Sequence, residues 1–155
     1  MILRQWPERG GDARAFERPE RGDEDGTRNR RRAALALRRR GDGRCVGCAL
    51  VVESCDVLGC EGATNATLNS LVVDEELRGR GAGRRLCVEA RAWTHETFGA
   101  DVVTVWCEKE LVPFYERCGF ELEPARGRDW GEACLRSFAS DDVARRWRER
   151  NATKI

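Results

Sequence analysis

Residues 71–86 of this 155-residue chain read LVVDEELRGRGAGRRL, and this stretch decides the fold. The apolar run Leu71–Val73 has the composition of a β-strand and leads into a turn with glycine at positions 79, 81 and 83. Glycine lets the backbone bend so that successive N–H groups point into one concavity. A helix that begins at such a turn adds unpaired N–H donors and the positive end of its dipole. The stretch therefore predicts a strand, a pyrophosphate-binding turn and a helix.

The segments on either side predict a mixed sheet with flanking helices. Apolar runs at 33–37 and 46–52 flank a glycine-containing turn, which indicates a β-hairpin, and a third strand covers 68–73. Further elements follow from hydrophobic spacing and β-branched composition. They are a helix over 81–98, a strand over 102–107, a short helix over 111–118, a strand from 120 that pairs with 133–138, and a charged helix over 141–150. This order predicts a single α/β (α+β) domain.

Composition excludes several classes of protein. Hydrophobic residues make up 41% of the chain, and 28 Lys and Arg nearly balance 27 Asp and Glu, so global charge predicts no particular partner. No apolar run reaches the roughly 20 residues of a membrane span, and the start lacks a hydrophobic signal core, so we expect a cytoplasmic protein without a membrane partner. The arginine runs 30–32 and 38–40 lack a nearby aromatic platform and have acids among them, which argues against nucleic-acid binding.

The glycine turn indicates which pyrophosphate is bound. A P-loop requires lysine and a hydroxyl residue after its last glycine, and the dinucleotide fingerprint requires glycine at position 84, where this chain has Arg84. Instead, Arg78-x-x-Gly81-x-Gly83 resembles the (Gln/Arg)-x-x-Gly-x-(Gly/Ala) motif of the GNAT superfamily of N-acetyltransferases. That resemblance implies acetyl-coenzyme A (acetyl-CoA) as co-substrate and no metal. It also implies that the strand before the turn splays from its neighbour and pairs with the pantetheine arm. The implied cofactor-binding residues are Leu71, Val72, Val73, Arg78, Gly79, Arg80, Gly81, Ala82, Gly83 and Arg84.

A second motif supports the same family. Residues 114–120 read FYERCGF and look like its Phe-Tyr-x-x-x-Gly-Phe signature, in which Tyr115 matches the tyrosine that protonates the coenzyme A thiolate. A model thiol has a pKa of about 8.5 and tyrosine about 10, so tyrosine is protonated at neutral pH and can donate. Phe114 and Tyr115 would equally serve as core aromatics beside a C-capping glycine.

The attacking amine must be neutral, which bears on the acceptor. At pH 7 about a tenth of an α-amino group is neutral, whereas a lysine is neutral only about once in several thousand molecules. An N-terminal amine therefore needs less help from a general base. Asn69 and Ser70 stand where some relatives carry a carboxylate, which leaves Glu108, acting through water, as the candidate base. A solvated loop charge is the alternative interpretation of Glu108. His95 is expected on the outer side of its helix, without a catalytic role.

A closer resemblance concerns the acceptor. Gln5-Trp6-Pro7, residues 77–86, Phe114-Tyr115 and Glu123-Pro124 are together similar to the family of N-alpha-acetyltransferases that modify the acidic N-terminus of actin. The resemblance implies a protein N-terminus, such as that of actin, as partner and a basic groove supplied by the arginines of 30–40. Two departures exist: only five residues precede Trp6, and the segment after Cys107 differs from the family's.

We therefore divide the chain into three regions. Residues 1–32 are predicted to form an N-terminal helix and loop region, truncated or lacking an edge strand, residues 33–140 the acetyltransferase core, and residues 141–155 a charged C-terminal tail. Acetylation of a small amine or a lysine side chain is an alternative activity. A non-catalytic acetyl-CoA-binding subunit is another, against which Tyr115 argues.

The cysteines pose a separate question. Cys45 and Cys48, followed by Cys55 and Cys60, resemble half of a zinc knuckle. Residues three apart on a strand point to opposite faces, however, so Cys45 and Cys48 cannot bind one ion without a bulge. We predict small buried hydrophobic side chains in place of a metal site, and no disulfides in a reducing cytosol.

Overall fold

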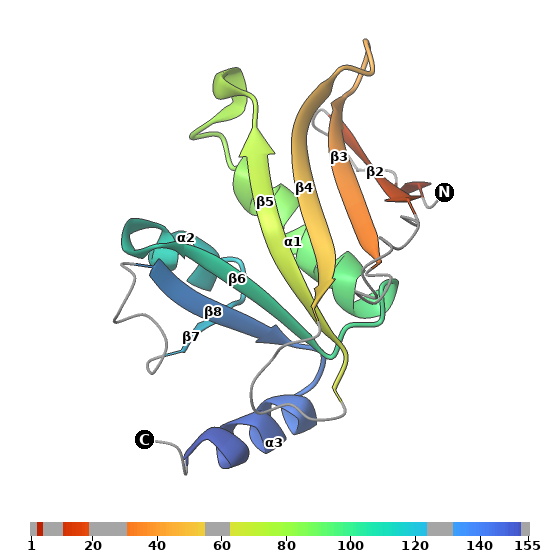
Figure 1. Cartoon of the computed structure of the whole chain (residues 1–155). Helices are drawn as coiled ribbons and strands as arrows, with labels where there is room; N and C mark the ends of the chain where they lie inside the picture. Colours follow the sequence, from red (N-terminus) through yellow and green to blue (C-terminus); the bar gives the residue numbers. More distant parts are fainter. Residues whose placement is uncertain (1–2, 5–10, 19–30, 55–62, 124–131, 153–155) are drawn as a thin grey trace, which may run out of the picture.

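The computed structural model describes residues 3–4, 11–18, 31–54, 63–123 and 132–152. Eight strands form one sheet in the order β1-β2-β3-β4-β5-β6-β8-β7 (Figure 1). The strands are β1 (Leu3–Arg4), β2 (Gly11–Arg18), β3 (Arg32–Arg39), β4 (Cys45–Ser54), β5 (Asn65–Val73), β6 (Val102–Glu108), β7 (Glu121–Leu122) and β8 (Glu132–Phe138). Among these, β5 and β6 run parallel and every other neighbouring pair is antiparallel. The predicted mixed sheet is confirmed.

The helices also follow the prediction. They are α1 (Ala82–Glu96), α2 (Val112–Glu116) and α3 (Asp141–Ala152), with 3-10 turns η1 (Glu75–Leu77) and η2 (Lys109–Leu111). In the described part of the chain, no helix is long and apolar enough to cross a membrane. Gly119 follows α2 with a φ of 87°, as expected for a glycine that ends a helix.

The N-terminal region differs from the prediction. Residues 11–18, expected as loop or polar helix, form β2, which pairs with β3 from Gly11↔Arg39 to Arg18↔Arg32. The local composition gives little strand signal, and the exposed edge of β3 supplies the partner that converts this segment into a strand. The helix and loop interpretation is therefore wrong for this segment, which belongs to the same sheet as the core.

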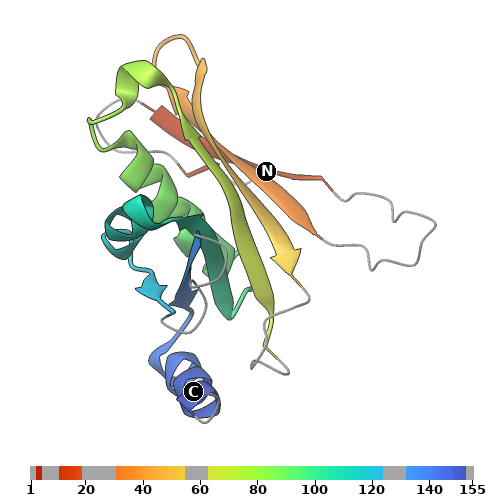
Figure 2. The same cartoon turned by 60° about the vertical axis from the view of Figure 1, so that its left-hand side comes forward.

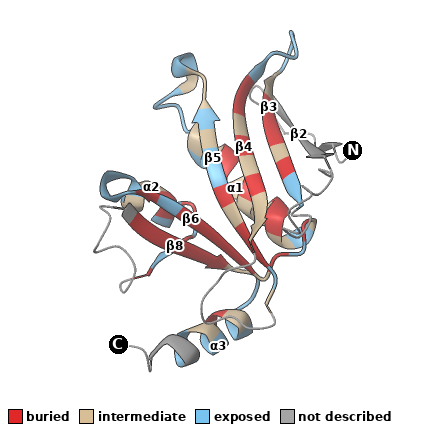
Figure 3. Cartoon of the chain, viewed as in Figure 1, coloured by how far each residue is buried: buried red, intermediate tan, exposed pale blue. Residues whose placement is uncertain are grey.

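The core lies between one face of the sheet and the helices α1 and α2 (Figures 2 and 3). Helix α1 buries Leu86, Ala90 and Trp93 against strands β4 to β6, and α2 adds Tyr115 to the same cluster. These side chains recur at helical spacing, which explains why the local sequence forms a helix in this position.

A β-bulge in β5 changes which side chains face the core. Leu68 pairs with Val51 and Ser70 with Leu50, so Asn69 is the extra residue. Before the bulge, Leu68 is buried, and after it Leu71 and Val73 pack against the same cluster. Asn69 and Ser70 are both exposed as a result. Under strict alternation after Leu68, the side chains of Leu71 and Val73 would point away from the core. The extra residue Asn69 shifts the alternation by one position, so both side chains point toward the core.

Helix α3 packs on the other face of β6 and β8. Val143 and Trp147 contact Val102 and Phe138 there. Arg136 of β8 is buried, donates to Glu123 at 2.8 Å and lies 5.0 Å from the Trp147 ring centroid. This ion pair joins the segment after β7 to β8, and cation–π packing joins both to the C-terminal helix.

Candidate active site

Strands β5 and β6 separate along their length. They pair only from Asn65↔Val102 to Thr67↔Thr104, and beyond these pairs the two strands diverge in a V (Figure 1). Within the described residues, the β6-facing edge of β5 from Leu68 to Val73 has no partner strand. Backbone groups on such an edge are free to pair with an extended ligand. The predicted splay is confirmed.

The glycine turn lies at the open end of this V, between η1 and α1. Gly79 and Gly81 have φ values of 71° and 81°, which L side chains rarely adopt, and a Cβ at either position would meet open space. Gly81 caps α1 without a side-chain hydrogen bond, and the first helical bond runs from Arg85 N to Gly81 O at 3.0 Å. The N–H groups of Ala82, Gly83 and Arg84 therefore have no acceptor within the helix, which suits an anion.

The apolar residues predicted to contact the cofactor lie where β5 leads into this turn. Leu71 and Val73 are half-buried against the core, whereas Val72 is 61% exposed on the opposite face. The apolar run thus contributes both to the core and to an open surface, and the predicted contact of these residues with the cofactor stays a prediction.

The arginines of the turn have mixed roles. Arg78 Nη1 lies 3.8 Å from Glu75 Oε1, Arg80 is exposed, and Arg84 Nε donates to the carbonyl of Arg117 at 3.3 Å. Arg84 thus contacts the end of α2. The turn's unpaired backbone N–H groups are thus its groups suited to an anion, and Arg78 and Arg80 add positive charge at the surface.

Tyr115 lies close to this turn because α2 packs on the first turn of α1. A Cβ on Gly83 would lie 3.9 Å from the Phe114 ring, and the Tyr115 ring meets the rings of Phe114 and Phe120 edge-on, at centroid distances of 5.0 and 5.9 Å. Gly83 thus leaves ordinary contact space for the aromatic ring of the second motif. The fold brings the two motifs together, although they are separated by about 30 residues in the sequence.

The environment of Tyr115 keeps its hydroxyl protonated. Burial raises the pKa of Tyr115 to about 12, and the nearby thiols of Cys87, Cys107 and Cys118 act in the same direction. The ring is only 8% exposed, and no described residue hydrogen-bonds to the hydroxyl. The Tyr115 hydroxyl is therefore protonated at neutral pH and has no hydrogen-bond partner among the described residues. The three thiols were missed in the sequence, although Cys87 follows Gly83 by one helical turn and Cys118 lies within the second motif.

Glu108 ends β6 and precedes η2, with its side chain exposed. Within the described residues, no hydrogen bond or ion pair joins Glu108 to Tyr115. Glu108 lies at the wide end of the V, in solvent. This position fits both interpretations of Glu108, a base that acts through water and a solvated loop charge.

Two predictions about other polar residues are wrong. His95 does not lie on the outer side of its helix: Nδ1–H donates to the Ala100 carbonyl at 2.7 Å, and Nε2 accepts from the Ser137 hydroxyl at 3.1 Å. Burial lowers the pKa of His95, which favours this neutral tautomer. Cys45 is exposed and Cys48 half-buried, so neither is a fully buried hydrophobic side chain.

Cys55 and Cys60 lie outside the described residues, as do Gln5-Trp6-Pro7, Pro124 and Arg30. In the part of the chain that is described, no group of three or more His, Cys, Asp or Glu side chains is arranged to hold a metal.

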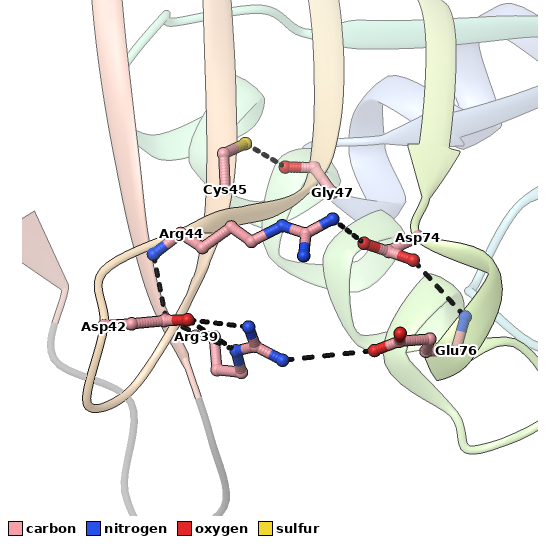
Figure 4. A network of polar contacts seen from close by, with 7 residues as sticks. All are labelled: Arg39, Asp42, Arg44, Cys45, Gly47, Asp74 and Glu76. Atoms are coloured by element: carbon pink, nitrogen blue, oxygen red, sulfur yellow. Dashed lines mark hydrogen bonds and ion pairs between the residues drawn. The ribbon is translucent and has the colours of Figure 1, made fainter.

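Several of the arginines expected to form a basic groove have partners within the chain. Arg31 donates to the Phe98 carbonyl, Arg38 to the Gly43 carbonyl, and Arg39 to Asp42. Arg39 and Arg44, with Asp74 and Glu76, form a network beside the glycine turn that the sequence did not reveal (Figure 4). Its two halves are separated by about 30 residues or more, so no local pattern indicates it.

Comparison with known proteins agrees with this geometry. Residues 32–122 match the family model described as an acetyltransferase (GNAT) domain. No curated protein sequence matches the chain. Among solved structures, the AtaTR complex bound with AcCoA has a TM-score of 0.55 and 21% identity, over 73% of this chain and 70% of the other. Spermidine N-acetyltransferase SpeG from Vibrio cholerae has a TM-score of 0.54 and 17% identity, over 77% and 70%. The NatC complex bound to Gag peptide and CoA has a TM-score of 0.51 and 18% identity, over 68% and 70%.

The chain belongs to the GNAT acetyltransferase family, because the family model covers more than half of its length. It is an acetyltransferase, and its co-substrate is acetyl-CoA. The solved structures share less than 25% identity with it and establish a common fold alone.

Proposed function

We propose that this acetyltransferase transfers the acetyl group directly to a primary amine in a ternary complex, with Tyr115 as the acid that protonates the departing thiolate. The observation that carries this proposal is the position of a buried, protonated tyrosine beside a glycine turn that opens the N-terminus of α1. In the family, the pyrophosphate occupies such a turn. We assign it here to the N–H groups at Ala82, Gly83 and Arg84 and to the positive charge of Arg78 and Arg80.

The chemistry balances with these groups. The neutral amine attacks the thioester carbonyl, a C–N bond forms, and the C–S bond breaks. The thiolate takes the hydroxyl proton of Tyr115, and the tyrosinate regains a proton from solvent. The proton lost by the amine leaves through water, with Glu108 as the candidate acceptor on β6. A pKa of about 12 keeps Tyr115 in its donor form over the whole physiological range.

We propose an α-amino group as the acceptor, at the N-terminus of a protein or peptide. One ground for this choice is that only a very small fraction of a lysine side chain is neutral at pH 7. The other is the absence of a strong base: Glu108 is exposed, and no buried carboxylate among the described residues lies at the open end of the V to deprotonate an ammonium group. The preference for an acidic, actin-like N-terminus rests on the sequence resemblance. The arginines of 31–39 support it only in part, since Arg39 pairs with Asp42 and Arg31 lies 3.6 Å from Glu53, which offsets part of their charge.

The role of Tyr115 is tested by Tyr115→Phe. Removing the hydroxyl should lower kcat by about 10²–10⁴-fold, while the affinity for acetyl-CoA, measured by calorimetry, changes little because the ring contacts with Phe114 and Phe120 persist. Unchanged turnover would remove Tyr115 from the mechanism. An equal loss of binding and turnover would assign it a structural role.

The acceptor is tested with a panel of Asp-, Glu-, Met- and Ala-led peptides, the same peptides with blocked N-termini and an internal lysine, and spermidine. Mass spectrometry should locate the acetyl group on free N-termini. Faster modification of acidic peptides that weakens with salt would support the actin-like preference. Acetylation of spermidine or of internal lysines alone would replace the proposed acceptor.

A further inference from the structure

The segment that leads into the glycine turn carries three consecutive carboxylates, Asp74, Glu75 and Glu76. In sequence they precede Ala82, whose N–H is the first of those available to an anion, by six to eight residues. Uncompensated negative charge on this segment would repel a pyrophosphate held by the turn, because charges interact over roughly a Debye length, about 8–10 Å at ordinary salt. The turn therefore needs a source of compensating positive charge.

Each of the three carboxylates faces an arginine. Arg44 Nη2 lies 3.2 Å from Asp74 Oδ2, Arg39 Nη1 lies 4.0 Å from Glu76 Oε2, and Arg78 pairs with Glu75. Arg39 and Arg44 belong to the β3–β4 hairpin and reach across to η1 (Figure 4). Two of the three arginines therefore come from a part of the chain that contains neither family motif: Arg44 pairs with Asp74, whereas Arg39 is shared between Asp42 and the more distant Glu76.

Asp74 joins the acidic segment before the glycine turn to the β3–β4 hairpin and strand β4. Its backbone N–H donates to the Val46 carbonyl at 2.8 Å, and its side chain accepts from Glu76 N at 3.3 Å, which caps η1. With only 23% of its side chain exposed, Asp74 is the most shielded acid of the three.

The hairpin that carries the arginines is itself held by Asp42. This carboxylate accepts from Arg39 Nη2 at 2.6 Å and from Arg44 N at 3.1 Å. The hydrogen bond from Arg39 is the largest cause of the lowered pKa of Asp42, about 2, so this carboxylate is ionised at neutral pH. Arg39 and Arg44 are thus presented to η1 from a turn with a defined geometry.

We infer that Arg44, with Arg39 beside it, is a positioning residue for acetyl-CoA: the β3–β4 hairpin neutralises the acidic segment before the glycine turn and holds that turn ready for the pyrophosphate. The inference rests on the proposed binding of the pyrophosphate by the turn. It predicts a defect in cofactor affinity without a defect in the chemical step, since neither arginine contacts Tyr115 in the described structure.

The test compares Arg44→Gln, the double variant Arg44→Gln/Asp74→Asn and the control Arg145→Gln, which removes exposed ion pairs from α3. Calorimetry gives the Kd for acetyl-CoA, and steady-state kinetics give KM and kcat. Arg44→Gln should raise Kd and KM by about three- to fivefold with kcat unchanged. The double variant should recover much of this loss, because the Asp74→Asn change keeps a side-chain oxygen that can cap η1 and removes the charge. Arg145→Gln should bind as wild type does.

Salt supplies a second readout that a merely structural role would not move. Raising the ionic strength from about 0.05 M to about 0.5 M should narrow the ratio between the Kd values of Arg44→Gln and wild type, since the repulsion is screened. Wild-type Kd in Arg44→Gln would overturn the inference, as would a double variant weaker than the single one. If the wild-type protein itself fails to bind acetyl-CoA, the assignment of the pyrophosphate to the turn fails, and this inference fails with it.

Discussion

The two ends of the β5–β6 pair have opposite properties. At the start of the two strands, Ala66 and Val103 are buried and paired, and Thr64 joins the strands by accepting from Val102 N and donating to Asp101 Oδ2. At the other end the strands diverge, Val72 is exposed, and two glycines in left-handed conformation follow. One strand therefore serves stability at one end and ligand access at the other.

This difference fits the binding mode proposed for acetyl-CoA, in which the open end of the pair receives the ligand. The paired end fixes the angle at which β5 and β6 separate, and β4 and β8 hold the outer edges of both strands. Free backbone groups at the open end then lie on well-ordered strands, and a ligand meets little cost of ordering them.

The largest effect should come from Leu68, just beyond the paired end. Leu68→Ala removes a side chain that is 3% exposed and should lower the free energy of unfolding by about 2–5 kcal/mol. The matched change Val72→Ala, at an exposed position of the same strand, should alter it by less than about 0.5 kcal/mol. Urea unfolding followed by circular dichroism measures both. Equal losses would remove the contrast between the two ends.

Alanine substitutions at Gly81 and Gly83, at the open end, should have smaller effects on stability, and these should differ between the two positions. Gly81→Ala forces a side chain into a left-handed conformation, which costs about 1–2 kcal/mol. Because the turn rearranges to relieve this strain, acetyl-CoA binding should weaken about fivefold or more. Gly83→Ala lies in the first turn of α1, where a Cβ would make ordinary contacts with Val73 and Phe114, and should stabilise the helix by up to about 1 kcal/mol.

Thermal denaturation and calorimetry with acetyl-CoA separate these two outcomes. A loss of affinity in Gly83→Ala that matches the loss in Gly81→Ala would mean that space, and not backbone conformation, governs anion binding at the turn.

The smallest expected effect is on the pH dependence of the free energy of unfolding. It arises near the paired end, where His95 links α1 to Ala100 and Ser137. Burial lowers the pKa of His95 in the folded state, so below about pH 6.5 the unfolded chain binds the proton first. Neutral His95 therefore contributes its full stabilisation above about pH 6.5, its pKa in the unfolded chain. This contribution is lost as the pH falls through the lower pKa that His95 has in the folded protein.

Unfolding followed between about pH 7.5 and pH 5 should show this loss in wild type and a smaller one in His95→Gln. An identical pH dependence in the two proteins would show that other groups cause the acid sensitivity.

Most elements were predictable because their signals are local. The apolar run at 33–37, the helical spacing around Leu86 and Ala90, and the proline and glycine that bound α2 each act within a few residues. The N-terminal strand β2 was not predictable in this way, since its partner β3 lies about 20 residues away and its own composition is polar.

The candidate site shows the same division. The motif residues Arg78, Gly81, Gly83 and Tyr115 were sufficient to indicate the family and hence its co-substrate, because a motif resemblance depends only on which residues stand at which spacing. Their mutual position depends on how α2 packs on α1, and the environment of Tyr115 depends on three cysteines from α1, β6 and the end of α2.

The sequence by itself determined the order of most elements, the glycine turn and the two family motifs, since each follows from local conformational preference or from residue types at fixed spacing. Only the tertiary structure decided where β5 leaves β6, which side of β5 faces the core after the bulge at Asn69, and which arginines meet Asp74 and Glu76. The physical reason is that strand register and ion pairing join residues that are far apart in the chain. Such contacts are selected by the packing of the whole domain and not by the neighbours of any one residue.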